Sequence, residues 1–364
     1  MTLLTAAQWQ ARKRLIVDRH ATPSNLRGGL QFVSVIAPIA GLWALIVLAA
    51  PLSLWLVAAL TGVLSLFLLR GFVLMHDCGH TCLFRSPALN RIGGFLLGVL
   101  AGMPQPVWAE NHRYHHTTNG NWAKYRGPLN VACVDDYLAM DERARRRYRY
   151  TRDILLSPIA GGLYFLVNPR ITWLRATLAL LRRRLARVRG AATPENGPLP
   201  GCASMAHYRH MLWNNLALFA IWAAMAWAVG PLLFFACYVV SGSLAGGYGI
   251  VLFTVQHNFE HAYASGDEGW SRDEAALHGT SFLVLPRWLN WITADAAYHH
   301  VHHLCANVPN YRLAACHEEH ALLFACVRRV GLFEIPASLK HILWDVAGRR
   351  LVSVAEATGP ARAG

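Results

Sequence analysis

Charged residues are scarce in this chain, and four long stretches contain none. Asp, Glu, Lys and Arg together make up 15% of the 364 residues, whereas hydrophobic residues make up 54%. This balance argues against a water-soluble globule. The uncharged stretches are 29–50, 51–69, 211–229 and 231–255. Each has about the 20 residues that a helix needs to cross the hydrocarbon core of a bilayer. We therefore expect four transmembrane helices, paired in two hairpins.

Regularly spaced cysteine pairs are also missing. The eight cysteines include no CxxC motif, so we expect them to be reduced and mostly buried rather than joined in a disulfide framework. The first fifteen residues, MTLLTAAQWQARKRL, lack the short apolar core and cleavage site of a signal peptide. No stretch predicts a second soluble domain such as a haem or flavin module.

Acidic residues are outnumbered, with 20 Asp and Glu against 34 Lys and Arg, for a net charge of +14. The placement of the basic residues argues for a membrane surface rather than nucleic acid. They precede the first apolar stretch and form the runs RARRRYR (143–149) and RRRLARVR (182–189), whereas the turns of both hairpins carry no charge. Positive residues concentrate on the cytoplasmic side of membrane proteins. We therefore expect both termini and the central region to be cytoplasmic, with arginines near anionic head groups.

The expected fold is all-α, with four transmembrane helices and a cytoplasmic helical cap. Two further apolar stretches, 92–104 and 154–167, are too short to span a bilayer and are expected to be re-entrant, interfacial or part of a packed core. The expected segments are a cytoplasmic lead-in (1–28), hairpin one (29–75), the first part of the cap (76–210), hairpin two (211–255), the second part of the cap (256–346) and a flexible tail (347–364).

Histidine is abundant: the chain has 18, of which 11 fall in four short clusters. Within each cluster the spacing is i, i+3 or i, i+4, which places side chains on one face of a helix. Each cluster also lies in a segment expected on the cytoplasmic side, two of them directly after a hairpin. The clusters are His76 and His80; His112, His115 and His116; His257 and His261; and His299, His300, His302 and His303.

Such a set predicts a metal site, because many buried cationic imidazoles would repel one another whereas neutral imidazole is a good ligand for transition metals. Eight or nine ligands exceed the coordination of one ion, so two ions are expected. His300 points off the shared face of its cluster and is expected to support ligands rather than bind metal. The other histidines, which are isolated or lack partners, are expected to be structural: His20, His207, His210, His278, His317, His320 and His341.

The motifs resemble those of the integral-membrane fatty acid desaturases. The resemblance is carried by HDCGH (76–80), HRYHH (112–116) and HHVHH (299–303). It is strengthened by WAENHRYHHTTNGN (108–121), VQHNFEHAY (255–263) and YHHVHHLCANVPNYRL (298–313). The last is similar to the third histidine box of bacterial Δ12 (omega-6) acyl-lipid desaturases. The resemblance covers about residues 30–320.

The resemblance implies a non-haem di-iron site. Carried onto matching positions, the implied ligands are His76, His80, His112, His115, His116, His261, His299, His302 and His303. Supporting or possible additional ligands are His257, Asp295, His300, Asp77 and Glu260. Asp295 departs from the family pattern, which usually has asparagine in that turn, and this leaves its role open.

The implied reaction is the introduction of a cis double bond into a membrane acyl chain, using O2 and two electrons. Those electrons would come from a separate ferredoxin- or cytochrome-type donor, and the implied location is a bacterial-type inner membrane. Two alternatives stay open from the residues. A lipid or carotenoid hydroxylase or ketolase of the same superfamily uses similar boxes. A membrane metal transporter would instead need polar ligands near the bilayer midplane.

Overall fold

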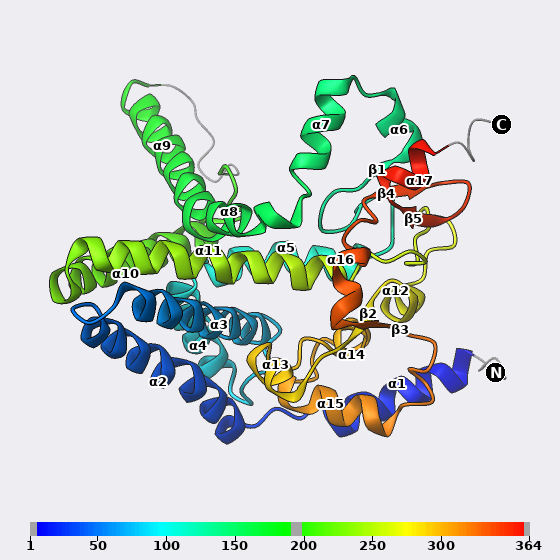
Figure 1. Cartoon of the computed structure of the whole chain (residues 1–364), viewed down its shortest axis with the longest axis horizontal. Helices are drawn as coiled ribbons and strands as arrows, with labels where there is room; N and C mark the ends of the chain where they lie inside the picture. Colours follow the sequence, from blue (N-terminus) through cyan, green and yellow to red (C-terminus); the bar gives the residue numbers. More distant parts are fainter. Residues whose placement is uncertain (1–5, 191–198, 360–364) are drawn as a thin grey trace.

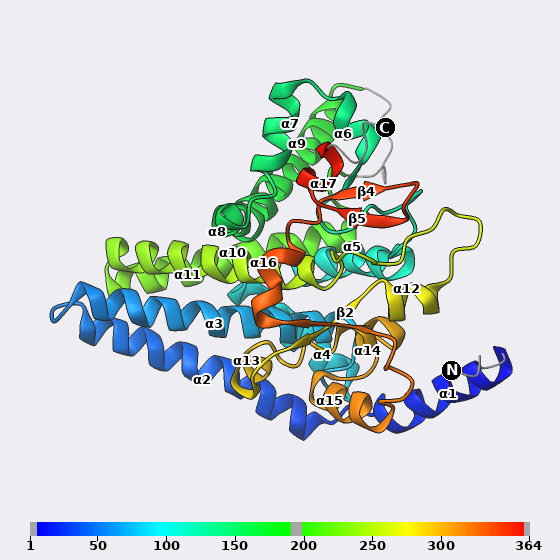
Figure 2. The same cartoon turned by 45° about the vertical axis from the view of Figure 1, so that its right-hand side comes forward.

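The computed structural model describes residues 6–190 and 199–359, and helices dominate it. Two long helical hairpins lie side by side, with their turns toward the left of Figure 1 and the histidine-bearing segments toward the right. Figure 2 shows the same layering from another direction, with α2 and α3 below α10 and α11. The long helices therefore form one end of the molecule, and the shorter helices and strands form the other.

The first hairpin consists of α2 (Asn25–Ala49) and α3 (Leu54–Gly79). Serine side chains cap both helices, Ser24 accepting from Arg27 N and Ser53 from Leu56 N, which satisfies backbone donors at each helix start. The buried residues of α2 recur at helical spacing and face α3: Val35, Ile39, Leu42 and Ile46. A continuous apolar stripe thus joins the two helices.

The second hairpin consists of α10 (Met205–Val229) and α11 (Pro231–Val255). Gly230 links them with φ of 90°, a left-handed conformation that a side chain disfavours. Pro231 then occupies the first turn of α11, where its missing N–H costs nothing. All four apolar stretches expected to span the membrane therefore form long helices.

A fifth stretch, Ile154–Val188, is also long and apolar enough to span a membrane. From the sequence alone, residues 154–167 were expected to be a separate apolar stretch that is too short to span a bilayer. The structure joins η1 (Ile154–Leu156), α8 (Ser157–Gly162), η2 (Leu163–Val167, a π-helical turn) and α9 (Asn168–Val188) into one helical run. By length and composition there are five candidate spans among the described residues, or six if one bent pair is counted.

That bent pair is α4 (Pro87–Leu100) and α5 (Gln105–Thr118), which meet at 100°. Gly102 has φ of 68° and Pro104 is the N-cap of α5, so the chain breaks and restarts between them. The expectation that 92–104 does not form a complete span by itself fits this break. The bend turns α5 back so that its histidines face the end of α3.

Helix α8 crosses α11 at unusually close range. A Cβ added to Gly161 would lie 2.2 Å from the backbone nitrogen of Gly247, so only glycine allows this approach. The contact places 154–167 against the half of α11 that precedes the histidines. This packing forms one wall of the cavity described below.

Short strands form two small sheets that the all-α expectation did not include. In one, β1 (Ala132–Cys133) pairs in parallel with β4 (Leu343–Asp345), which pairs antiparallel with β5 (Arg350–Val352). In the other, β2 (Ser281–Val284) pairs in parallel with β3 (Arg328–Gly331). These pairings tie the C-terminal region to segments far away in sequence.

The flexible tail expected from residue 347 needs correction. Strand β5 and helix α17 (Val354–Thr358) lie within it. Leu351 and Val352 are buried, and Ser353 and Glu356 form a capping box at the start of α17. Burial and capping hold this segment in place; residues 360–364 lie outside the described part of the chain.

The remaining helices complete the fold. Helix α1 (Ala6–His20) runs along α15 (Asn310–Glu319) at the lower right of Figure 1. The others are α6 (Val134–Ala139), α7 (Glu142–Tyr150), α12 (Arg272–His278), α13 (Arg287–Ile292), α14 (His299–Leu304), η3 (Leu332–Glu334) and α16 (Ile335–Ser338).

Candidate metal centre

Three helices carry most of the histidines into one region. His76 lies in the last turn of α3 and His80 is its C-cap residue. His112, His115 and His116 lie on α5, and the third box forms the short helix α14. Their side chains form two groups in which the candidate ligand atoms lie within 4.8 Å of one another.

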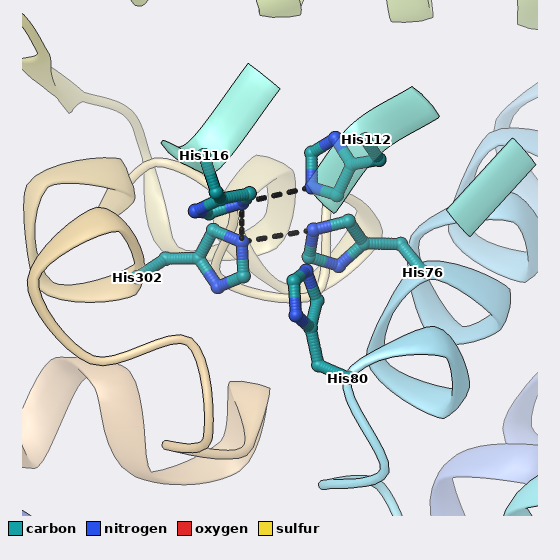
Figure 3. Close-up of side chains that lie close together, drawn as sticks. All are labelled: His76, His80, His112, His116 and His302. Carbon is teal, nitrogen blue, oxygen red and sulfur yellow. Dashed lines mark hydrogen bonds between the residues drawn. The ribbon is translucent and has the colours of Figure 1, made fainter. Parts of the chain in front are cut away.

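The first group draws on all three boxes and consists of His76, His80, His112, His116 and His302. Figure 3 shows these five rings converging, with short contacts between ring nitrogens. His302 Nε2 lies 2.9 Å from His76 Nε2 and 3.0 Å from His116 Nε2. His116 Nε2 also lies 2.9 Å from His112 Nε2. These nitrogens surround one small volume.

The second group consists of His115, His257, His299 and His303, all of them buried. His299 Nε2 lies 2.9 Å from His257 Nε2, and His115 Nε2 lies 3.2 Å from His303 Nε2. The two groups adjoin, because the ring of His116 stacks on that of His303 with centroids 4.2 Å apart. The neighbours on α5, His115 and His116, thus serve different groups.

These spacings fit metal ions. Two imidazoles at right angles around a metal, each at about 2.1 Å, bring their nitrogens to about 3 Å apart. Hydrogen bonding alone explains the arrangement less well, because neutral imidazole has only one N–H donor. Moreover, the buried Nε2 atom of His80 has no hydrogen-bond partner, and a buried polar atom without a partner is costly. A cation in each group would satisfy these nitrogens.

Burial also favours the neutral, metal-binding form of these side chains. It lowers the pKa of His80, His299, His302 and His303, with neighbouring cationic forms adding to the effect. It lowers the pKa of His257 to about 4, although a hydrogen bond to Gly279 opposes that shift. At neutral pH these imidazoles are therefore uncharged and able to donate a lone pair.

Two of the rings are oriented by hydrogen bonds on their outer nitrogen. His257 Nδ1 lies 3.0 Å from the carbonyl oxygen of Gly279, so Nδ1 donates and Nε2 faces the group. His76 Nδ1 lies 3.0 Å from Asp77 Oδ1, and Asp77 Oδ2 accepts a bond from Asn310 N at 3.0 Å. Such outer partners fix the ring orientation of metal-ligating histidines. Asp77 thus lies between His76 and the start of α15.

The expectation for His261 needs correction. Its side chain is 77% exposed and pairs with Glu260 at 3.7 Å, away from both groups. Helix α11 ends at Val255, so the i, i+4 relation assumed for His257 and His261 does not exist. His257 instead lies in the second group, and the sequence signal that could have identified it is its position immediately after a long apolar helix. Glu260 lies on the surface beside Arg350, at 2.9 Å, and supports no histidine of the groups.

His300 and Asp295 were expected to support the ligands, and neither lies in the two histidine groups. His300 Nε2 lies 2.8 Å from His317 Nδ1, and its ring packs against Phe324, on the side of α14 away from the metal groups. Asp295 belongs to neither group. Burial raises its pKa to about 6, Arg70 opposes the shift and Asp77 adds to it. Asp295 thus interacts electrostatically with a buried arginine of α3.

A cavity of about 560 Å³ opens onto both groups, a size typical of small-molecule sites. Histidines of the first group (His76, His112, His302) and of the second (His115, His299) line its floor. Its walls are mostly apolar and come from α3, α5, the run from η1 to η2, and α11; they include Leu69, Phe72, Val73, Trp108, Phe165, Ile250 and Phe253. Arg152 and Asp153 lie among the polar lining residues. The cavity suits a long apolar ligand.

Two imidazole groups that could hold metal ions lie beside an apolar cavity, on helices long and apolar enough to span a bilayer, an arrangement typical of histidine-rich membrane metalloenzymes. Comparison with known proteins identifies the family. A sequence model of the fatty acid desaturases matches residues 53–327. A fatty acid desaturase from Bacillus subtilis is 34% identical over 358 residues, covering 97% of this chain and 93% of its own. The chain therefore belongs to the fatty acid desaturase family and is an oxidoreductase.

Two other relatives carry more specific names. An sn-1 oleoyl-lipid 12-desaturase from Synechocystis is 22% identical over 251 residues, covering 69% of this chain and 64% of its own. A temperature-sensitive sn-2 acyl-lipid omega-3 desaturase (ferredoxin) from Arabidopsis thaliana is 42% identical over 50 residues, which is 14% of this chain and 12% of its own. The resemblance inferred from the histidine boxes is thus confirmed at the level of the family.

Proposed function

We propose that this desaturase introduces a cis double bond into a membrane acyl chain, with two iron ions held by the two histidine groups and O2 as co-substrate. One observation carries the proposal: a single apolar cavity is lined by histidines of both groups. Iron suits the site because imidazole is a common ligand for it and it supports O2 chemistry. When bound, the iron pair supplies the oxidising power to remove hydrogen from unactivated methylenes, which no side chain provides.

The residues of the chain would hold the two ions, orient the ligating rings and shield the site from water. The first ion would be held by His76, His80, His112, His116 and His302, and the second by His115, His257, His299 and His303. Asp77 orients His76, and the Gly279 carbonyl orients His257.

The apolar walls of the cavity exclude water and hold the acyl chain extended across the histidines that line the cavity. Trp108 stacks on His112 at 4.6 Å between ring centroids, so a ligating ring itself forms part of the wall. The position of the new double bond then depends on how deeply the acyl chain enters the cavity.

The substrate and electron donor are proposed from chemistry and from relatives. The apolar cavity fits an acyl chain, and the Synechocystis relative is named for a lipid-bound oleoyl group. We propose a lipid-linked acyl substrate on that basis. No haem or flavin module is found in the sequence, and the Arabidopsis relative is named with ferredoxin. We therefore propose an external donor of the ferredoxin or cytochrome type.

The proposed membrane arrangement keeps four spans, α2, α3, α10 and α11. In Ile154–Val188, arginines crowd the last turns (182–189), which favours a helix lying at the interface, with the basic end near head groups. By the positive-inside rule both termini and the metal centre would face the cytoplasm, in a bacterial-type inner membrane.

The function is tested by the lipids of a desaturase-deficient bacterial host expressing the chain. Gas chromatography with mass spectrometry of the fatty acid methyl esters should reveal a new monoene or diene. His115→Ala should abolish it, whereas the matched His278→Ala variant, altered at a histidine outside both metal groups, should keep it. An oxygenated fatty acid in place of the olefin would overturn desaturation in favour of hydroxylation. Unchanged lipids with the wild-type chain and a competent donor would overturn both.

A further inference from the structure

A third cluster of metal-binding side chains lies apart from the nine histidines. It joins His20, the last residue of α1, to Cys316 and His320 at the end of α15. One candidate ligand atom from each lies within 4.8 Å of the others. Cys316 is fully buried and His20 is 3% exposed. His20, which precedes Cys316 by 296 positions and His320 by 300, thus meets a thiol and a second imidazole.

The polar atoms of this cluster are not satisfied by the protein. Both ring nitrogens of His20 and the Nε2 atom of His320 are buried and form no hydrogen bond. The nearest carboxylate oxygen, Glu319 Oε2, lies 3.2 Å from His20 Nε2. This contact leaves His20 Nδ1 and His320 Nε2 without a partner, and a buried polar atom without a partner needs an explanation.

We propose that His20, Cys316 and His320 bind a structural zinc ion, with Glu319 as the fourth ligand. Two nitrogens, one sulfur and one carboxylate oxygen form a donor set that zinc accepts in tetrahedral geometry. Zinc ligands of this kind lie about 3.3–3.8 Å apart. The ligand atoms of His20, Cys316 and His320 already lie within 4.8 Å of one another, and Glu319, which is outside that group, would have to rotate its side chain toward it. On binding, the Cys316 thiol releases its proton to solvent and the sulfur bonds to the metal. No electrons are transferred.

The chemistry of this site differs from that of the desaturase centre. The two large groups offer only imidazole, whereas this one offers a thiolate, which selects zinc over iron in a closed site. Cys316 is fully buried, so its sulfur is shielded from oxidants in solvent. The site therefore serves structure rather than redox chemistry.

The position of the site shows what the zinc would hold. It fastens α1 to the C-terminal end of α15, where Arg19 also pairs with Glu319 at 2.8 Å. The other end of α15 contacts the desaturase centre, since Asn310 N donates to Asp77. One short helix, about 15 Å long, thus links the zinc site to the carboxylate that orients His76. Zinc binding stabilises that helix from the far end.

Cobalt substitution tests the proposal without relying on desaturase activity. The chain is purified in detergent with a histidine-free tag, depleted of metal and titrated with Co²⁺ alone. A cobalt–thiolate bond gives a near-ultraviolet charge-transfer band that all-imidazole sites cannot give. We expect this band in the wild type and in Cys326→Ser, whose half-buried cysteine lies outside the cluster. The band should be absent in Cys316→Ser.

Metal analysis of protein purified from zinc-containing medium provides the second readout. The wild type and Cys326→Ser should each retain about one zinc per chain, and Cys316→Ser less than a tenth of that. If Cys316→Ser does not fold, X-ray absorption at the zinc edge of the wild type decides, because one sulfur at about 2.3 Å is expected. A wild type with no thiolate band and no zinc-bound sulfur overturns the proposal, as does a band that survives in Cys316→Ser. Either result would leave His20 and Glu319 as an ordinary ion pair.

Discussion

Replacing His257 with glutamine should remove one of the four ligands of the second metal group. His257 Nε2 lies 2.9 Å from His299 Nε2, and its other nitrogen is held by Gly279. Loss of an outer-shell partner alone typically lowers metal affinity 10- to 100-fold, so loss of the ligand should lower it at least about 100-fold, or about 3 kcal/mol. Iron should fall from about two to about one per chain, and desaturation should become undetectable.

His261→Gln is the matched control, because the two histidines lie four residues apart and only one is buried. The His261 side chain is 77% exposed and its ion pair with Glu260 lies in solvent, where such pairs contribute little. Its replacement should change stability by less than about 0.5 kcal/mol and leave iron unchanged. Iron content by mass spectrometry and product by gas chromatography are measured on both. Iron loss in His261→Gln with full iron in His257→Gln would refute the assignment.

Three other perturbations follow from the structure. Asp77→Asn should weaken the orientation of His76 and lower turnover about 10- to 100-fold at unchanged substrate affinity, measured as kcat and KM. Gly161→Ala should lower the free energy of unfolding by about 3 kcal/mol or more, because its Cβ would lie 2.2 Å from the backbone of α11. Gly62→Ala, which has open space around it, should leave the free energy of unfolding unchanged. Thermal melting of both variants in detergent measures the difference. In the metal-free protein, His257 has a folded pKa of about 4, below its unfolded value of 6.5. The unfolded chain therefore binds that proton more readily, so stability is complete above pH 6.5 and falls by about 3 kcal/mol toward pH 4, measured by denaturant unfolding. A free energy of unfolding of the metal-free protein that stays constant over this pH range would contradict the burial of a neutral His257.

The sequence predicted the convergence of histidine side chains where the helices are regular. His112, His115 and His116 share a face of α5, and their i, i+3, i+4 spacing translated directly into convergence. The direction of the His76 side chain could be predicted in the same way, because His76 lies in the last turn of the regular helix α3. Periodicity is informative there because the helix continues through the motif.

The same reasoning failed where the helix ends. Helix α11 stops at Val255, so the spacing of His257 and His261 carried no information about a shared face. The short pairs of β1 with β4 and of β2 with β3 join distant segments, and strands of two to four residues leave no periodic signal.

The cluster of His20, Cys316 and His320 depends on tertiary packing and could not be predicted from the sequence. His20 and His320 are each unremarkable in the sequence, since 300 residues separate them. Only the docking of α1 on α15 brings them to Cys316. Likewise, the helical run of Ile154–Val188 packs on α11 through a close glycine contact, which composition alone does not predict.

Iron analysis combined with Mössbauer spectroscopy of the purified, active protein tests the central claim most directly. The two histidine groups predict about two irons per chain, both in nitrogen-rich surroundings, and both responding when the protein is reduced and exposed to O2. Full desaturase activity in a preparation with less than one iron per chain, or with another metal in both groups, would contradict the account.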